Sequence, residues 1–177
     1  MPLPVKPPSV PPVSKYALEL LDQSHDRTGF YSGLETVDRY LKETARGHTE
    51  KGVSLTRVLV DIDATTSKTI LGFFTLTPCV AEVATWKGLP KGLPKNRVGM
   101  VLLARLAVSK GHQRQGLGAV LLALAREIAR DSLLAVGGIG LIVDAANEEV
   151  AAFYSHFGFQ RTEAGSLRLF LPTASLV

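Results

Sequence analysis

Cysteine is almost absent from this chain, since Cys79 is the only one among 177 residues. An intramolecular disulfide is therefore excluded, and so is a metal cluster of the cysteine-rich kind. The four histidines show no spacing typical of metal ligands, and we expect no bound metal. We interpret Cys79 as a small buried apolar residue rather than as a nucleophile.

Long hydrophobic runs are missing as well. The first residues, MPLPVKPPSVPPVS, contain neither a basic segment nor an unbroken apolar segment, so they do not form a secretory signal. No apolar stretch reaches membrane-spanning length. We therefore expect a cytoplasmic protein without membrane contact. Residues 1–13 are predicted to form a mobile, proline-rich arm, followed by a single domain over residues 14–177.

Charge of neither sign dominates the composition. Twenty basic residues stand against 16 acidic ones, which gives a net charge of +4. The sequence pI near 9.3 suggests an anionic partner or cofactor. The excess is too small to indicate nucleic-acid binding without further evidence.

Hydrophobic patterning predicts an α/β domain in which one mixed β-sheet carries helices on both faces. Helices are expected from about Thr36, which could cap the first of them, over 116–134, and from an Asn147 cap to Phe157. Pro78 is expected to end a strand. Strands are predicted at residues 16–21, 54–60, 69–77, 101–108, 140–145 and 166–171.

The most informative segment is VLLARLAVSKGHQRQGLGA, from Val101 to Ala119. An apolar strand runs into a basic, glycine-rich turn, and the turn opens a helix. Such an arrangement binds phosphate through backbone N–H groups and the helix dipole. No Lys-Ser/Thr pair follows the last glycine, and the G-x-G-x-x-G spacing is absent, so nucleoside triphosphatase and dinucleotide-binding loops are disfavoured.

The turn Gln113 to Gly118 resembles the [RQ]-x-x-G-x-[GA] loop of the GCN5-related N-acetyltransferase (GNAT) family, which wraps the pyrophosphate of acetyl-CoA. The predicted order of elements resembles that family's fold, in which the sheet splays open at the central strands. The resemblance implies that acetyl-CoA contacts Leu106, Ala107, Val108, Gln113, Arg114, Gln115, Gly116, Leu117, Gly118, Ala119, Asn147 and Phe153.

The segment AFYSHFGF, residues 152–159, is similar to a GNAT pattern in which the tyrosine is the general acid. The resemblance implies that Tyr154 protonates the departing CoA thiolate. A phenol with a pKa of about 10 can protonate a thiol with a pKa of about 8.5 at a cost of about 2 kcal/mol. The alternative is a core tyrosine packed beside two phenylalanines. No general base stands out, and a base acting through water can be Glu35, Glu82 or another acid.

A narrower set of motifs resembles the acetyltransferase toxins of bacterial toxin–antitoxin pairs. The set comprises FYSG, VDRYL, LGFFTLT, LPK, LLARLAV and the final LFLP. This resemblance implies acetylation of the α-amino group of aminoacyl-tRNA, which blocks translation. It also implies a small DNA-binding antitoxin as partner, and we expect a homodimer.

Basic residues could line a groove for an anionic acceptor such as tRNA. Arg105 lies one residue before the strand end that is expected to contact acetyl-CoA. We expect it either to face the acceptor substrate or to pair with an acid of the sheet. The other candidates, each of which could equally be a solvated surface charge, are Arg39, Lys42, Arg46, Lys91 and Arg97. Two further functions stay open: acetylation of a small amine or a protein N-terminus, and a non-catalytic acyl-CoA-binding module.

Overall fold

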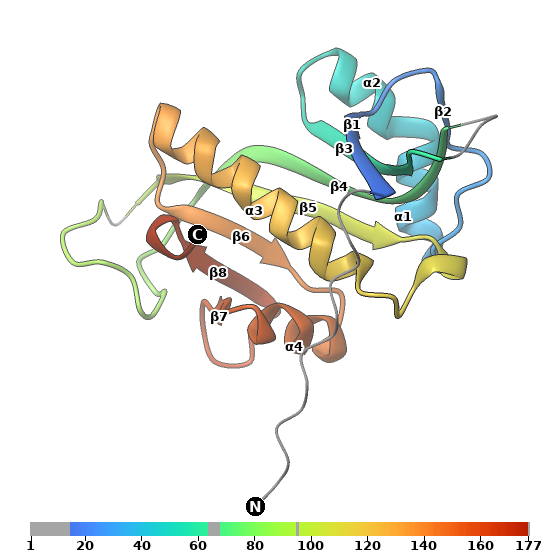
Figure 1. The fold of residues 1–177 in the computed structure, drawn as a ribbon. Coiled ribbons are helices and arrows are strands. Elements are labelled where there is room, and N and C mark those ends of the chain that lie inside the picture. The colour runs from blue at the N-terminus through green and yellow to red at the C-terminus, as the bar shows by residue number, and fades with distance from the viewer. Residues whose placement is uncertain (1–14, 64–67, 95, 177) are drawn as a thin grey trace, which may run out of the picture.

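The chain folds around one eight-stranded mixed sheet (Figure 1). The computed structural model describes residues 15–63, 68–94 and 96–176, so the predicted arm at 1–13 lies outside the described residues. The strands are β1 (Tyr16–Leu20), β2 (His25–Asp26), β3 (Leu55–Asp61), β4 (Lys68–Ala81), β5 (Val98–Val108), β6 (Gly140–Asp144), β7 (Gln160–Arg161) and β8 (Arg168–Pro172). Their order is β1-β3-β4-β5-β6-β8-β7, and β2 pairs with β4.

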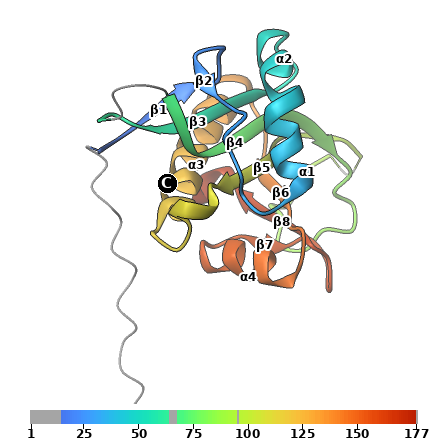
Figure 2. The ribbon, with the colours of Figure 1, turned by 90° about the vertical axis from the view of Figure 1, so that its right-hand side faces the viewer.

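Helices cover both faces of the sheet, as predicted (Figure 2). One face carries α3 (Leu117–Val136) and α4 (Glu148–His156), whose apolar side chains share a core with β4, β5, β6 and β8. The other face carries α1 (Glu35–Arg39), a π-helical turn (Tyr40–Thr44) and α2 (Ala45–Glu50). Short 3-10 turns occur at Lys110–His112 and Thr173–Ser175.

Two details of the strand and helix prediction were wrong. Pro78 does not end its strand, because β3 stops pairing at Leu76 and the side of β4 that faced β3 is unpaired beyond it. A proline is tolerated at such an edge, since no ladder donor is lost there. The first helix begins at Glu35, so Thr36 lies inside it and does not cap it. The two-residue strands β2 and β7 were too short to produce a periodic signal.

A β-bulge in β5 decides which way its last residues point. Thr75 pairs with Arg105 while Leu76 pairs with Leu103, so Ala104 is the extra residue. An extra residue reverses the alternation of side chains beyond it. As a result, Leu106 packs on the α3 and α4 face, while Ala107 packs on the α1 and α2 face.

The central strands separate at this bulge. The parallel pairing of β5 with β6 covers only Val101 to Leu103. Residues 105–108 therefore have a paired edge toward β4 and, among the described strands, no partner on the other side. The predicted splay of the sheet is present at this point.

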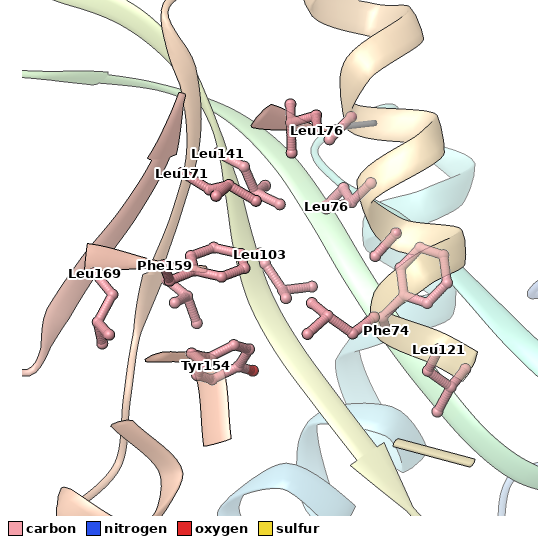
Figure 3. Close-up of a cluster of buried hydrophobic side chains, with 14 of the residues drawn as sticks. Phe74, Leu76, Leu103, Leu121, Leu141, Tyr154, Phe159, Leu169, Leu171 and Leu176 are labelled. Carbon is pink, nitrogen blue, oxygen red and sulfur yellow. The ribbon is translucent and has the colours of Figure 1, made fainter. Parts of the chain in front are cut away.

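Helix α3 lies directly against the central strands (Figure 3). Leu121 is fully buried among Phe74 and Leu103 of the sheet. Gly72 of β4 makes this approach possible, because a Cβ there would lie 2.7 Å from Leu121 Cδ1 and 2.9 Å from the Ala107 carbonyl oxygen. A side chain at this position would displace the Leu121 side chain and press on the backbone of β5 at Ala107, which bounds the cavity described below.

We therefore expect Gly72→Ala to lower the free energy of unfolding by about 1–3 kcal/mol, the usual cost of overpacking a core. The matched control is Gly47→Ala in α2, where a Cβ would meet nothing within 4 Å. That change should be neutral or stabilise the protein by about 0.5–1 kcal/mol. Urea unfolding of the two variants checks this, and equal effects would contradict the packing argument.

Candidate active site

A cavity of about 470 Å³ opens where β5 leaves β6. Its floor is the end of β5, Leu106 to Val108, and one wall is the start of α4 with Val150 and Tyr154. The opposite wall is the loop from Ser32 to Leu34, which precedes α1. The unpaired edge of β5 is thus accessible to an extended ligand that can add to it like a strand.

The glycine-rich turn forms a second cavity of about 390 Å³, which shares Val108, Gln113, Gly118 and Phe153 with the first. Arg114 has a φ of 61° and Gly116 a φ of 83°, both in the left-handed region. These two residues fold the chain back so that α3 begins at Leu117 with its first N–H groups toward the turn. Arg114 is exposed and brings a positive charge to this helix start. The predicted pyrophosphate cradle therefore has backbone donors, a dipole and a cation in one place.

Other predicted loop residues have structural contacts. The Gln113 side-chain amide donates to the carbonyl oxygens of Ser32 at 2.8 Å and Val108 at 3.0 Å. Gln115 donates to the Gly111 carbonyl at 3.3 Å. Leu117 is buried in the core, while Gly118 and Ala119 line the cavity. Gln113 thus fastens the turn to the end of β5, and its NH₂ group is already engaged.

Tyr154 lies on the wall of the first cavity and is only 4% exposed. Its ring packs edge-on against Phe153 and Phe159, and in Figure 3 its hydroxyl oxygen points toward the side of β5. Burial raises the pKa of the phenol well above its usual range. The hydroxyl is therefore protonated at every physiological pH and can act as a proton donor.

Helix α4 is positioned by its first residue. Asn147 caps the helix, as predicted, because its side-chain oxygen accepts a hydrogen bond from the Val150 N–H at 2.9 Å. Glu149 follows in the first turn and lines the cavity, whereas Glu35 and Glu82, the two candidate bases, do not. Among the described residues that line this cavity, Glu149 is the one carboxylate, and sequence reasoning did not single it out.

Arg105 lies on the sheet face that carries α1 and α2. The bulge at Ala104 turns it there, and its guanidinium lies 5.0 Å from the centre of the Tyr40 ring. It also donates to the Ala104 carbonyl at 2.6 Å. Arg105 is exposed and pairs with no acid of the sheet among the described residues, so the second of its two expected roles is wrong.

The other basic candidates fall into two groups. Arg39, Lys42 and Arg46 lie on the α1–α2 segment near Arg105, and Arg46 is 3.4 Å from Glu50. Lys91 and Arg97 are exposed on the connection that precedes β5. They lie at the opposite end of that strand, roughly 33 Å from Val108 at 3.3 Å per residue. The structure therefore does not bring the two groups together at one cavity mouth.

A larger hollow, about 610 Å³, lies elsewhere, between β4 and the last turns of α3. It is lined mainly by apolar side chains and includes Cys79, which is half-buried rather than buried. Burial raises the pKa of this thiol, which disfavours a nucleophilic thiolate.

Within the described residues, no group of three His, Cys, Asp or Glu side chains could hold a metal ion. No described helix is both long and apolar enough to cross a membrane.

Comparison with known proteins agrees with this geometry. Residues 57–161 match the model of the acetyltransferase (GNAT) domain. The tRNA-acetylating toxin of Mycobacterium tuberculosis is 31% identical over 154 residues, which cover 85% of this chain and 88% of that protein.

Two solved toxins have the same fold. A mutant of KacT superposes with a TM-score of 0.84 at 32% identity, covering 92% of this chain and 97% of that one. AtaT in complex with acetyl-methionyl-tRNAfMet superposes with a TM-score of 0.81 at 30% identity, covering 91% and 96%. AtaT has also been solved with its antitoxin AtaR and with acetyl-CoA. The sheet that splays beyond Leu103, the cradle at the start of α3 and these likenesses agree: the chain belongs to the GNAT family of acetyl-CoA-dependent N-acetyltransferases.

Proposed function

We propose that this acetyltransferase is a toxin that transfers the acetyl group of acetyl-CoA to the α-amino group of aminoacyl-tRNA. The observation that carries the proposal is one cavity in which the unpaired end of β5 faces Tyr154, with the glycine-rich turn at one end. The curated and solved relatives named as tRNA-acetylating or bound to acetylated tRNA support the choice of acceptor. Acetylation of a charged tRNA would remove the amine that peptide-bond formation needs.

The cavity suits acetyl-CoA along its whole length. The start of α3 and Arg114 would hold the pyrophosphate, and the open edge of β5 would pair with the pantetheine amides. Gln113 holds these two parts in register through its bonds to Ser32 and Val108. Phe153 and Asn147 bound the channel on the α4 side.

Three groups would carry the chemistry. A backbone N–H near Leu106 at the bulged strand end would stabilise the negative charge that develops on the carbonyl oxygen. Tyr154 would donate its proton to the sulfur as the C–S bond breaks. The burial that raises the pKa of Tyr154 also disfavours a free thiolate in the same cavity, which raises the proton affinity of the sulfur.

The acceptor amine must lose a proton to attack. An α-amine, with a pKa of about 7.7–8.0, needs far less help than a lysine side chain with a pKa of about 10.4. Glu149 lines the cavity and could accept this proton through water. Glu35 and Glu82, the acids singled out from the sequence, do not line it. An α-amino acceptor therefore fits a site that offers one carboxylate and no histidine among its described lining residues.

The acceptor would approach from the α1–α2 side. Arg105, stacked on Tyr40, lies next to the cavity floor and would meet the acceptor end, while Arg39, Lys42 and Arg46 would meet backbone phosphates.

We further propose that the protein acts in the cytoplasm, where charged tRNA is found. A small DNA-binding antitoxin and a homodimer complete the proposal, and the antitoxin complexes of AtaT and KacT support the first of these partners. Acetylation of a small amine or a protein N-terminus is the alternative, and the same cavity would serve it.

Reversing the charge at the turn should weaken cofactor binding. We expect Arg114→Glu to lower the affinity for acetyl-CoA roughly tenfold to a hundredfold, because a charge-assisted hydrogen bond contributes about 1.5–3 kcal/mol. The variant Gly116→Asp should act in the same direction, because it adds a negative group where the pyrophosphate would lie. Calorimetry measures both. Lys91→Glu, the same charge change at the far end of β5, is the control and should leave the affinity unchanged.

Removing one hydroxyl should separate catalysis from binding. We expect Tyr154→Phe to bind acetyl-CoA normally but to lose about 10²–10⁴-fold in single-turnover rate, the range for a general acid. Because the raised pKa keeps the phenol protonated, the wild-type rate should rise through the amine pKa and show no alkaline decline up to a pH of about 10. A near wild-type rate in the variant would mean that water or another group protonates the thiolate.

Binding of tRNA should depend on the α1–α2 cations. Reversing Arg39 and Lys42 together should weaken tRNA acetylation and reduce the slope of log affinity against log salt, while leaving acetyl-CoA affinity unchanged. Reversing Lys91 with Arg97 removes equal charge and is expected to have the smaller effect on tRNA acetylation, given the distance of these two residues from the cavity.

Growth arrest on expression should disappear with Tyr154→Phe. A harmless wild-type chain that acetylates a polyamine or peptide but no charged tRNA would favour the alternative acceptor.

A further inference from the structure

Asp38 is a buried carboxylate that the chemistry above does not use. It lies in the middle of α1 and is 5% exposed. No Lys, Arg or His among the described residues forms an ion pair with it. A charge placed there without a cation is costly to the fold unless strong hydrogen bonds satisfy it. Its position therefore calls for an explanation beyond helix formation.

The hydrogen-bond partner of Asp38 is Ser32, which is itself 6% exposed. One oxygen, Asp38 Oδ1, accepts both the Ser32 N–H at 2.9 Å and the Ser32 hydroxyl at 2.6 Å. Ser32 Oγ in turn accepts the Leu34 N–H at 3.2 Å. Asp38 lies in the first turn of α1, but it is not the N-cap, since that position is held by Leu34, which makes no side-chain cap bond. The carboxylate instead fixes the backbone of the loop that precedes the helix.

The same loop is tied to the cofactor side of the molecule. The Ser32 carbonyl accepts the Gln113 amide, which also binds the carbonyl of Val108 at the end of β5. The Tyr31 carbonyl accepts the Lys110 N–H at 2.7 Å. A continuous series of hydrogen bonds therefore runs from Asp38 through Ser32 and Gln113 to the strand edge.

Ser32, Gly33 and Leu34 form the wall of the 470 Å³ cavity opposite Tyr154. They do not line the neighbouring cavity at the glycine-rich turn. Whatever holds this loop in place therefore sets the width of the channel at its thioester end directly, and it reaches the phosphate end only indirectly, through the Gln113 side chain.

We propose that Asp38 is a positioning residue, which holds the Ser32–Leu34 wall against the pantetheine and acetyl end of acetyl-CoA and so sets the affinity for that part of the cofactor. The inference rests on the proposed placement of acetyl-CoA between β5 and α4. Asp38 does not touch the cofactor. It acts through the two bonds to Ser32.

The test compares two ligands by calorimetry: acetyl-CoA, which fills both cavities, and 3′,5′-ADP, which lacks the pantetheine arm. Asp38→Leu removes the acceptor oxygen, and we expect acetyl-CoA affinity to fall about tenfold with 3′,5′-ADP affinity unchanged. Asp38→Asn keeps an oxygen at the same place and should retain most of the affinity. Ser32→Ala removes the hydroxyl bond from the other partner and should lower acetyl-CoA affinity selectively, whereas Ser32→Thr should preserve it.

The control is Thr56→Val, which removes the 2.8 Å hydroxyl bond between Thr56 and Thr75. Both residues are fully buried and line none of the cavities described. This variant should lose stability without changing either affinity. If Asp38→Leu does not fold, Ser32→Ala and its threonine counterpart carry the test.

The proposal is overturned if folded Asp38→Leu or Ser32→Ala binds acetyl-CoA as the wild type does, or if both ligands or the control lose affinity equally. Failure of the proposed acceptor looks different, because tRNA would then go unacetylated while the two affinities still respond as described. Failure of the cofactor placement is also distinct, since Arg114→Glu would then leave the affinity for 3′,5′-ADP unchanged.

Discussion

The separation of β5 from β6 after Leu103 is the constraint on which the rest of the site depends. A strand in the middle of a sheet normally has both edges paired, and an unpaired edge inside a protein leaves backbone donors and acceptors without partners. Here the unpaired edge faces a cavity instead of solvent or core. The bulge at Ala104, one residue further on, sets which side chains face that cavity and which face α1 and α2.

In the proposed reaction, the two faces of the sheet would serve the two substrates. On one face, α3 packs against β4 at Gly72 and brings its N-terminus to the end of β5, so the helix dipole and the strand edge lie along one channel. On the other face, Arg105 stacks on Tyr40 among the cations of the α1–α2 segment. The reaction proposed for this chain would take place where the two faces meet, through the gap between the central strands.

Polar side chains stabilise this geometry. Tyr154 is held by aromatic neighbours in a place where burial keeps its proton, and Asn147 fixes the start of the helix that carries it. Across the cavity, the carboxylate of Asp38 is compensated by two hydrogen bonds from Ser32 rather than by a cation. Such bonds are directional, so they fix the position of a wall more sharply than apolar packing alone.

The sequence by itself determined the local features, because these depend on neighbours within a few residues. The glycine-rich turn, the Asn147 cap, the main strands and the two long helices all follow from spacing and composition, and so does the position of Tyr154 on the last helix. Tertiary structure decided the rest. The bulge that turns Arg105, the continuation of β4 through Pro78 and the link from Asp38 to the cofactor strand depend on pairing between segments far apart in the chain. No local pattern encodes such pairing, since a polar residue on a helix is expected in solvent until the fold shows which partner buries it.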